Sequence, residues 1–134
     1  MFWPFRRRRL RRADDHLKLA HEYTRKGMLD EAIEEYKRAI EIDPKFAYSY
    51  LNLGVAYGSK GMIKEAISEL ETAVRLNPRY GKAHANLANA YFLDEQYDLA
   101  WKHVREAERL GEEVDALIES LKLVSKEPRK NSGG

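Results

Sequence analysis

Histidines and acidic residues are the side chains of this sequence that could carry out acid–base chemistry or bind a metal ion. The chain has four histidines, His16, His21, His84 and His103. No two of them stand four residues apart, the spacing that places two metal ligands on one helix face. The chain has no cysteine, which excludes disulfides, thiolate catalysis and cysteine-based zinc or iron–sulfur sites. The sequence therefore predicts no metal site.

Acidic residues that stand next to one another also form no catalytic pair. In Asp14–Asp15, Glu34–Glu35 and Glu112–Glu113 the two side chains are adjacent, so they point in different directions on a helix. We interpret them as solvated charges or as acids at helix starts. The chain also has no glycine-rich loop that could hold a phosphate. We therefore predict a protein that is not an enzyme and needs no cofactor.

Positive charge is concentrated at the start of the chain. Six of the 24 basic residues lie in the first twelve positions, which hold no acid. The remainder has 18 basic and 22 acidic side chains and a net charge of −4. The basic character therefore belongs to an N-terminal arm, residues 1–12, and not to a nucleic-acid surface spread over the fold. The arm begins with aromatic residues and has no apolar stretch after the arginines, so it does not have the order of a secretory signal. The sequence has no run of 18 apolar residues and therefore predicts no membrane-spanning helix.

A 34-residue repeat organises the elements that position these side chains. It predicts three units, residues 13–46, 47–80 and 81–114. The residues that recur at this step are Leu19, Leu53 and Leu87; Tyr23, Tyr57 and Tyr91; Ala32, Ala66 and Ala100; Ala39, Ala73 and Ala107; Pro44 and Pro78; and Gly27 and Gly61.

Each unit is predicted to fold as two helices. In the second unit, apolar residues fall at steps of three and four on both sides of Gly61, where the chain can turn. Asn77 precedes Pro78 and ends the second helix, because a residue before proline avoids the α conformation. Small residues such as Gly54 and Ala66 are expected where the paired helices approach closely. One pair cannot bury both of its faces, so stacking of units must supply the core.

This pattern resembles the tetratricopeptide repeat, whose signature is W-x2-L-G-x2-Y, then A-x3-F, then P. The resemblance covers about three quarters of the chain, and it implies an all-α, right-handed solenoid of helix-turn-helix repeats. Unit three has Glu112 where the proline would stand, which suggests that its last helix runs more directly into the next. The second unit matches with Tyr50, Leu53, Gly54, Tyr57, Ala66, Leu70 and Pro78; the first with His16, Leu19, Ala20, Tyr23, Ala32, Tyr36 and Pro44; and the third with His84, Leu87, Ala88, Tyr91, Ala100 and Val104.

A seventh helix, over residues 113–125, is predicted to cap the third unit. Its apolar residues lie on one stripe that can cover the open face of the last repeat. The stripe consists of Val114, Leu117, Ile118, Leu121 and Val124. The polar tail at 126–134 is expected to be disordered.

The resemblance also implies a concave groove that is lined by the first helix of each unit and binds a peptide. Asn52 and Asn86 share one repeat position, and their amides could pair with the backbone of a partner segment. The alternative is a passive spacer in which asparagine is simply common at this position. The residues that we expect to line the groove are Leu17, His21, Tyr48, Leu51, Asn52, Val55, Lys82, Asn86 and Asn89.

One branch of the family binds the acidic C-terminal tails of heat-shock chaperones through five positions. Asn52 and Lys82 match that set. Leu17, His21 and Asn86 replace a lysine, an asparagine and an arginine. Two matches of five argue against chaperone-tail binding.

The individual histidines and Trp101 are assigned mainly to packing. His16 and His84 share a repeat position between helices, and Trp101 occupies the core position of Ile33 and Ile67. His103 is expected on the outer, solvated face. His21 is the exception, because it is expected to project toward the groove.

Three interpretations of the N-terminal arm remain open. Its arginines could bind an anionic membrane with its aromatics at the interface, or its arginines could bind nucleic acid. The third interpretation is a solvated, disordered start whose aromatics dock on the first repeat or on another protein. We rank nucleic acid last, because the rest of the chain is acidic. The residues concerned are Phe2, Trp3, Phe5, Arg6, Arg7, Arg8 and Arg9.

The sequence thus predicts a non-enzymatic adaptor or scaffold that holds a segment of another protein. The alternative is a peripheral membrane or assembly-complex subunit that is anchored through the arm. Either function is consistent with a cytoplasmic protein, located in the second case at a membrane surface. The sequence gives no indication of the oligomeric state.

Overall fold

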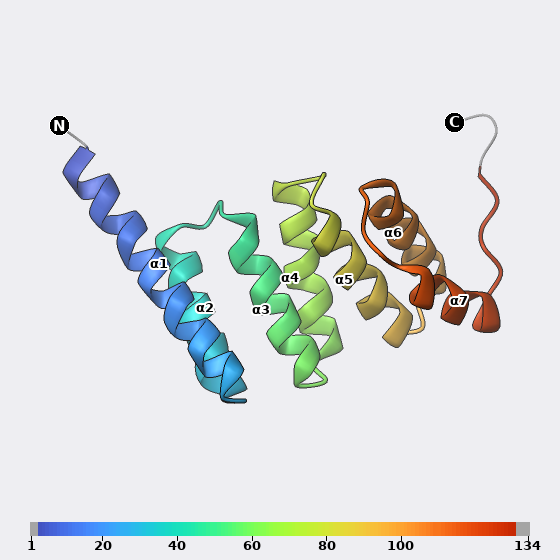
Figure 1. Cartoon of the computed structure of the whole chain (residues 1–134), viewed down its shortest axis with the longest axis horizontal. Coiled ribbons are helices and arrows are strands. Elements are labelled where there is room, and N and C mark those ends of the chain that lie inside the picture. The colour runs from blue at the N-terminus through green and yellow to red at the C-terminus, as the bar shows by residue number, and fades with distance from the viewer. Residues whose placement is uncertain (1–2, 131–134) are drawn as a thin grey trace. The chain divides into compact units, whose positions relative to one another are not determined.

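The computed structural model describes residues 3–130, which fold into seven α-helices without a strand (Figure 1). The predicted all-α repeat architecture is confirmed. The helices are α1 (Trp3–Arg25), α2 (Leu29–Ile42), α3 (Ala47–Ser59), α4 (Ile63–Leu76), α5 (Gly81–Leu93), α6 (Tyr97–Arg109) and α7 (Asp115–Val124).

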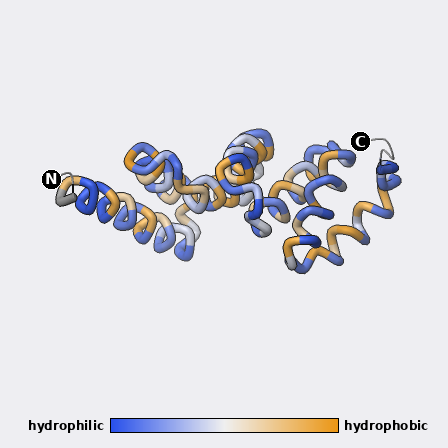
Figure 2. Tube along the Cα trace, turned by 90° about the horizontal axis from the view of Figure 1, so that it is seen from above, coloured by the Kyte–Doolittle hydropathy of each residue, from blue (hydrophilic) through white to orange (hydrophobic). Residues whose placement is uncertain are grey.

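The chain divides into two compact units. The first unit ends at Pro78 and contains α1 to α4, and the second begins at Arg79 and contains α5 to α7. In the first unit α1 packs against α2, α3 against α4, and α2 against α3. In the second unit α5 packs against α6, and α7 packs on α6. Hydrophobic and hydrophilic segments alternate along most of the helices, as amphipathic packing requires (Figure 2).

Small residues bring the paired helices close together. Ala32 and Ala66 are 0% and 1% exposed, respectively. Gly54 on α3 faces α4, where a Cβ atom at this position would lie 2.7 Å from Cγ of Leu70 and 3.3 Å from the carbonyl oxygen of Ala66. The close approach predicted at Gly54 is therefore present, and it leaves no room for a side chain.

One type of turn ends four of the helices. The residue at the turn has a positive φ, and the N–H of the following residue donates to a carbonyl five residues back. Gly27, Gly61 and Gly111 have φ angles of 75°, 78° and 91°, whereas Glu95 occupies the glycine position of the third repeat with φ 60°. The four hydrogen bonds are Met28 N to Tyr23 O at 2.8 Å, Met62 N to Tyr57 O at 2.9 Å, Gln96 N to Tyr91 O at 2.9 Å and Glu112 N to Ala107 O at 3.0 Å.

The exit from the third repeat differs from the sequence expectation. Without a proline, α6 was expected to run more directly into the last helix. Instead α6 ends at Arg109 and residues 110–114 separate it from α7. Gly111 causes this break. It has a left-handed backbone conformation that reverses the chain, which a proline would not do.

The last helix covers α6 as a cap. Val114, Ile118 and Leu121 are at most 6% exposed, whereas Val124, which was expected in the same stripe, is 50% exposed. The tail beyond α7 has no regular structure up to residue 130, yet Glu127 accepts hydrogen bonds from Nε and Nη2 of Arg105, both at 2.8 Å. Residues 131–134 of the expected disordered tail lie outside the described part of the chain.

The N-terminal arm is a direct continuation of α1. Residues 3–12 are helical, so the interpretation of a disordered start does not hold for them. The residues from Phe5 to Arg12 are exposed, and Ala13, at 5% exposure, is the first buried residue. Phe2 lies outside the described residues. In the described part of the chain, no helix is both long enough and apolar enough to cross a membrane.

Candidate functional site

The predicted groove residues of the first unit divide into a surface and a core. Tyr48 and Val55 on α3 are 38% and 41% exposed, and His21 on α1 is half-buried. Leu17 and Leu51 were expected on the same surface, but they are 6% and 5% exposed. Both leucines therefore belong to the core, because their positions on the helices turn them toward the neighbouring helices.

His21 connects three helices at this surface. Its Nδ1 lies 3.0 Å from the hydroxyl of Tyr36 on α2, and its Nε2 lies 3.1 Å from the hydroxyl of Tyr48 on α3. Its ring also meets the Tyr36 ring edge-on at 5.7 Å. Both ring nitrogens are thus engaged within the protein, and the histidine fixes the position of Tyr48. We call His21, Tyr48, Asn52 and Val55 the α1–α3 face.

The two repeat-equivalent asparagines make the same hydrogen bond. Asn52 Nδ2 donates to the carbonyl oxygen of Tyr48, and Asn86 Nδ2 donates to that of Lys82, both at 2.8 Å. Each amide nitrogen is therefore engaged on its own helix, and Oδ1 is the acceptor that the side chain can offer to a partner. This conformation suits a partner that donates N–H groups.

In the second unit, the predicted groove residues lie along α5. Lys82 and Asn89 are exposed and Asn86 is half-buried. The nearby ring of Phe92, also half-buried, lies 6.0 Å from that of Tyr97 on α6. The face of α5 thus offers one cation, two amides and an aromatic edge.

Polar contacts between the helices of each pair were missed by the sequence reasoning. Glu35 was interpreted as solvated, but it is 5% exposed and its Oε2 lies 2.5 Å from Nδ1 of His16. A second carboxylate oxygen of Glu35 accepts a hydrogen bond from Arg38. Glu35 is thus buried together with two partners, His16 and Arg38, which offset the free-energy cost of removing its charge from water.

The equivalent contact in the second unit joins two histidines. His103 was expected on a solvated face, but it is half-buried, with its Nδ1 3.0 Å from Nδ1 of His84 and its ring stacked 5.7 Å from that of Tyr91. Burial first, and then the charge of His84, lower the pKa of His103 to about 4. Neutral histidine is therefore the form that this packing accommodates.

The repeat itself could have revealed these contacts. His16 and Glu35 are 19 residues apart, and so are His84 and His103, at the same two repeat positions. In the middle repeat these two positions hold Tyr50 and Glu69, and the Tyr50 hydroxyl donates instead to the carbonyl oxygen of Pro44 at 2.8 Å. Burial, followed by the charge of Glu69, raises the pKa of Tyr50.

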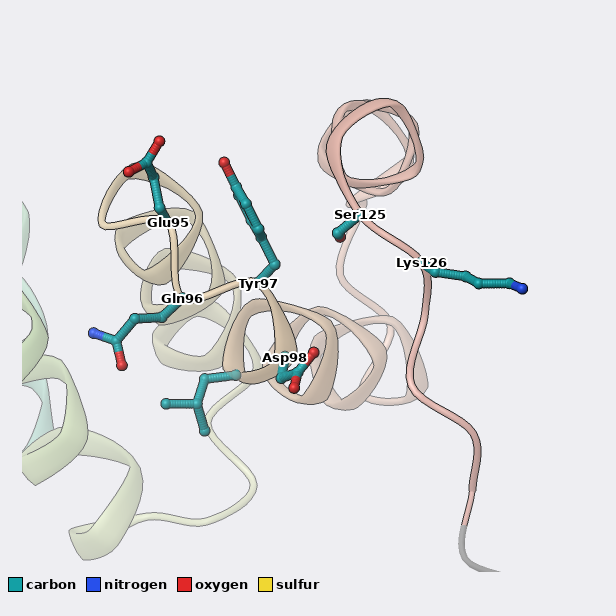
Figure 3. Close-up of a pocket in the computed structure, with 7 residues that line it drawn as sticks. Glu95, Gln96, Tyr97, Asp98, Ser125 and Lys126 are labelled. Atoms are coloured by element: carbon teal, nitrogen blue, oxygen red, sulfur yellow. The ribbon is translucent and has the colours of Figure 1, made fainter.

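A pocket of about 500 Å³ lies between the α5–α6 turn and the end of α7 (Figure 3). Glu95, Gln96, Asp98, Ser125 and Lys126 contribute its polar groups. The side chains of Gln96 and Lys126 point away from one another, so the polar groups do not converge on a common point (Figure 3). The pocket lacks the arrangement of a small-molecule site.

Among residues 3–130, no group of three or more histidine, aspartate or glutamate side chains is arranged to hold a metal ion. Trp101 is 2% exposed and donates from Nε1 to Ser125 Oγ at 2.9 Å, so its predicted packing role is confirmed.

Sequence models of known families match the first two repeats. A model described as "TPR repeat" matches residues 20–61, and one described as "Tetratricopeptide repeat" matches residues 47–80. No curated protein sequence matches the chain.

Solved structures of several proteins share the fold. The first TPR of Spaghetti (RPAP3), bound to the HSP90 peptide SRMEEVD, is 27% identical, with a TM-score of 0.79 over 86% of this chain and 95% of that one. The Arabidopsis OM64 TPR domain is 17% identical, with a TM-score of 0.81 over 86% and 98% of the two chains. The TPR2B domain of yeast Sti1, from a pHsp70 complex, is 21% identical, with a TM-score of 0.76 over 84% and 94%.

Proposed function

Because the chain belongs to the tetratricopeptide-repeat family, we propose that it is a non-enzymatic adaptor that binds a segment of a partner protein on its first helices. The α1–α3 face is the proposed contact in the first unit. The face of α5, with Lys82, Asn86 and Asn89, is the proposed contact in the second unit.

The observation that carries this proposal is the exposure of Tyr48 and Val55. Single apolar side chains at a surface are common, but Tyr48 and Val55 stand seven residues apart on one face of α3, with Asn52 between them, and so form a local patch. Apolar anchors beside hydrogen-bonding groups are what a partner segment needs for affinity and for orientation.

The similarity to the RPAP3 domain, which holds an HSP90 peptide, supports a peptide as the partner. The residues of this chain favour an apolar anchor over an acidic terminus in the first unit. Leu17 is buried and both ring nitrogens of His21 are engaged with tyrosines, so neither side chain is placed to receive a carboxylate. We therefore expect SRMEEVD to bind more weakly than a segment with an aromatic or aliphatic anchor.

The test begins with peptides selected by phage display on the full chain. Isothermal titration calorimetry then compares the wild type with Val55→Glu, which places a charge where the apolar anchor docks. We expect Val55→Glu to weaken the selected peptide by roughly tenfold or more, since a buried charge without a partner costs more than 1 kcal/mol.

Leu19→Glu is the matched control. Leu19 is 37% exposed on α1, and it points about 200° around the helix from His21, on the opposite side. Circular dichroism verifies that both variants are folded. Equal affinities of wild type and Val55→Glu, or a loss confined to Leu19→Glu, would place the binding surface elsewhere.

A further inference from the structure

We propose that the N-terminal arm is a membrane-surface anchor that meets an anionic lipid bilayer end-on, with the axis of α1 along the bilayer normal. This inference is independent of the adaptor function, because it concerns residues that lie outside the α1–α3 face.

The arm extends from the fold as an exposed length of helix. The segment from Phe5 to Arg12 is exposed, and burial begins only at Ala13. Eight helical residues span about 12 Å. Figure 1 shows the N-terminal half of α1 extending past the end of α2, against which the remainder of the helix packs. The end of the arm can therefore reach a surface that the rest of the first unit does not touch.

Arginines cover the arm on every side. Successive helical residues are about 100° apart, so Arg6 to Arg9 alone point in four directions around the axis. Phe5 and Leu10 lie about 140° apart, with Arg6 and Arg9 between them. A helix that lies flat on a membrane needs a single apolar stripe, and residues 5–12 have none.

Polarity changes along the axis instead of around it. Aromatic residues stand at 2, 3 and 5, the six arginines follow between 6 and 12, and the exposed acids Asp14 and Asp15 come next. Phe5 is 71% exposed, and the guanidinium carbon of Arg8 lies 6.0 Å from the centre of its ring.

This axial order matches the layers of an anionic membrane surface. Aromatic rings favour the interfacial region, arginines bind lipid phosphates while their alkyl chains lie along the apolar boundary, and acids are repelled by the lipid charge. A ring of arginines around an end-on helix can contact phosphates on all sides. The same arginines could contact nucleic acid, but that partner would leave the aromatic tip without a role and would meet the acids directly behind the arginines.

The test measures co-sedimentation of the full chain with vesicles of equal parts phosphatidylcholine and phosphatidylglycerol. The decisive variant is the exchange Phe5→Arg with Arg12→Phe. It keeps the composition and net charge of the chain, and the two positions lie on nearly the same side of the helix, seven residues apart. Amphipathicity around the axis is therefore retained, and the only change is that one aromatic ring moves from the tip of the arm to its base.

We expect the wild type to bind and the exchange variant to bind roughly tenfold less, with added salt weakening the wild type because arginine–lipid attraction is screened. Neutral phosphatidylcholine vesicles are expected to bind neither protein. Equal binding of wild type and exchange variant would overturn the end-on geometry. Binding of a DNA duplex or RNA hairpin without binding to the anionic vesicles would overturn the lipid assignment.

The orientation of α1 on the membrane can be measured directly with labelled cysteine variants, because the chain has no cysteine of its own. Phe5→Cys and Arg12→Cys are each labelled with an environment-sensitive fluorophore and mixed with the anionic vesicles. End-on binding predicts a blue shift for the label at 5 and none for the label at 12. Equal shifts at both positions would show a helix that lies flat and would contradict the proposal.

Discussion

At the scale of single residues, Glu95 has the backbone conformation that glycine supplies at the equivalent turns. Its φ is 60°, and the first two repeats have Gly27 and Gly61 at this position. A left-handed backbone costs a residue with a Cβ atom about 1 kcal/mol. We expect Glu95→Gly to raise the free energy of unfolding by about 0.5 kcal/mol in urea titration, because the freedom that glycine gains in the unfolded chain offsets part of the relieved strain.

The neighbouring residue provides the control for this prediction. Gln96→Gly adds the same unfolded-state freedom without relieving a positive φ, so we expect it to lower stability. A fall in the urea midpoint for both variants would show that Glu95 is not strained.

The surroundings of His103 lead to a second prediction at this scale, which concerns the pH dependence of folding stability. Burial, the charge of His84 and Lys102 lower the pKa of His103 to about 4, whereas the unfolded residue titrates near 6.5. Between these values the unfolded state binds a proton that the folded state does not, so stability must fall as pH decreases from about 6.5 to 4. Above pH 6.5 the histidine is neutral in both states and contributes no pH dependence.

The measurement compares urea unfolding of wild type and His103→Gln across this range. We expect the wild type to lose up to roughly 2 kcal/mol more than the variant between pH 7 and 4, because glutamine keeps a polar group but does not titrate. Parallel pH profiles would mean that His103 is solvated after all.

Residue-level contacts were the least predictable part of the molecule. The sequence indicated which residues recur, but the partner of each buried polar group depends on how the two helices of a pair face one another. Glu35 and His103 were assigned to solvent because each was considered on its own helix, where acids and histidines are usually exposed. Their repeat partners, His16 and His84, lie 19 residues away.

At the scale of elements, Gly54 and Gly58 of α3 differ in how closely the neighbouring helix α4 approaches them. A Cβ atom on Gly54 would lie 2.7 Å from Cγ of Leu70, which is fully buried and has little room to move. A Cβ atom on Gly58 would lie 4.0 Å from Cβ of Ala66, which is a normal contact. Both substitutions to alanine bring the same gain in helix propensity, about 1 kcal/mol.

We therefore expect Gly58→Ala to stabilise the protein slightly and Gly54→Ala to destabilise it by about 1–2 kcal/mol, because α3 and α4 must separate. Thermal unfolding of the two variants measures the difference. If Gly54→Ala melts at or above the temperature of Gly58→Ala, the close approach of the two helices is not what requires glycine.

The helices themselves could be predicted almost completely, since the 34-residue period gives their number and the apolar spacing their faces. Two helix boundaries could not be predicted. The arginines of the arm disfavour a helix through mutual repulsion, yet α1 begins at Trp3. The end of α6 depends on the backbone of Gly111, which repeat comparison does not reveal because it has no counterpart in the other repeats.

At the scale of the whole molecule, each compact unit has its own proposed surface for a partner. Exposed apolar and amide groups lie on the first helices of the repeats, and the charged arm lies on the far end of α1. The placement of the proposed surface on α1 and α3 follows from the family resemblance and stays a prediction. The composition of this helix face was not predictable, because the exposure of Val55 and the burial of Leu51 depend on a rotation of about 40° around one helix.

The most direct test of the adaptor function is to map a bound peptide on the isotopically labelled chain by NMR. The peptide is one selected on the wild-type protein. We expect the side-chain amide of Asn52 and the backbone amides of residues 48–55 to shift, together with the ring signals of His21, while the exposed residues of α2, such as Glu34 and Lys37, stay unchanged. Shifts confined to α2 and α4, or to residues 5–12 of the arm, would contradict binding on the first helices.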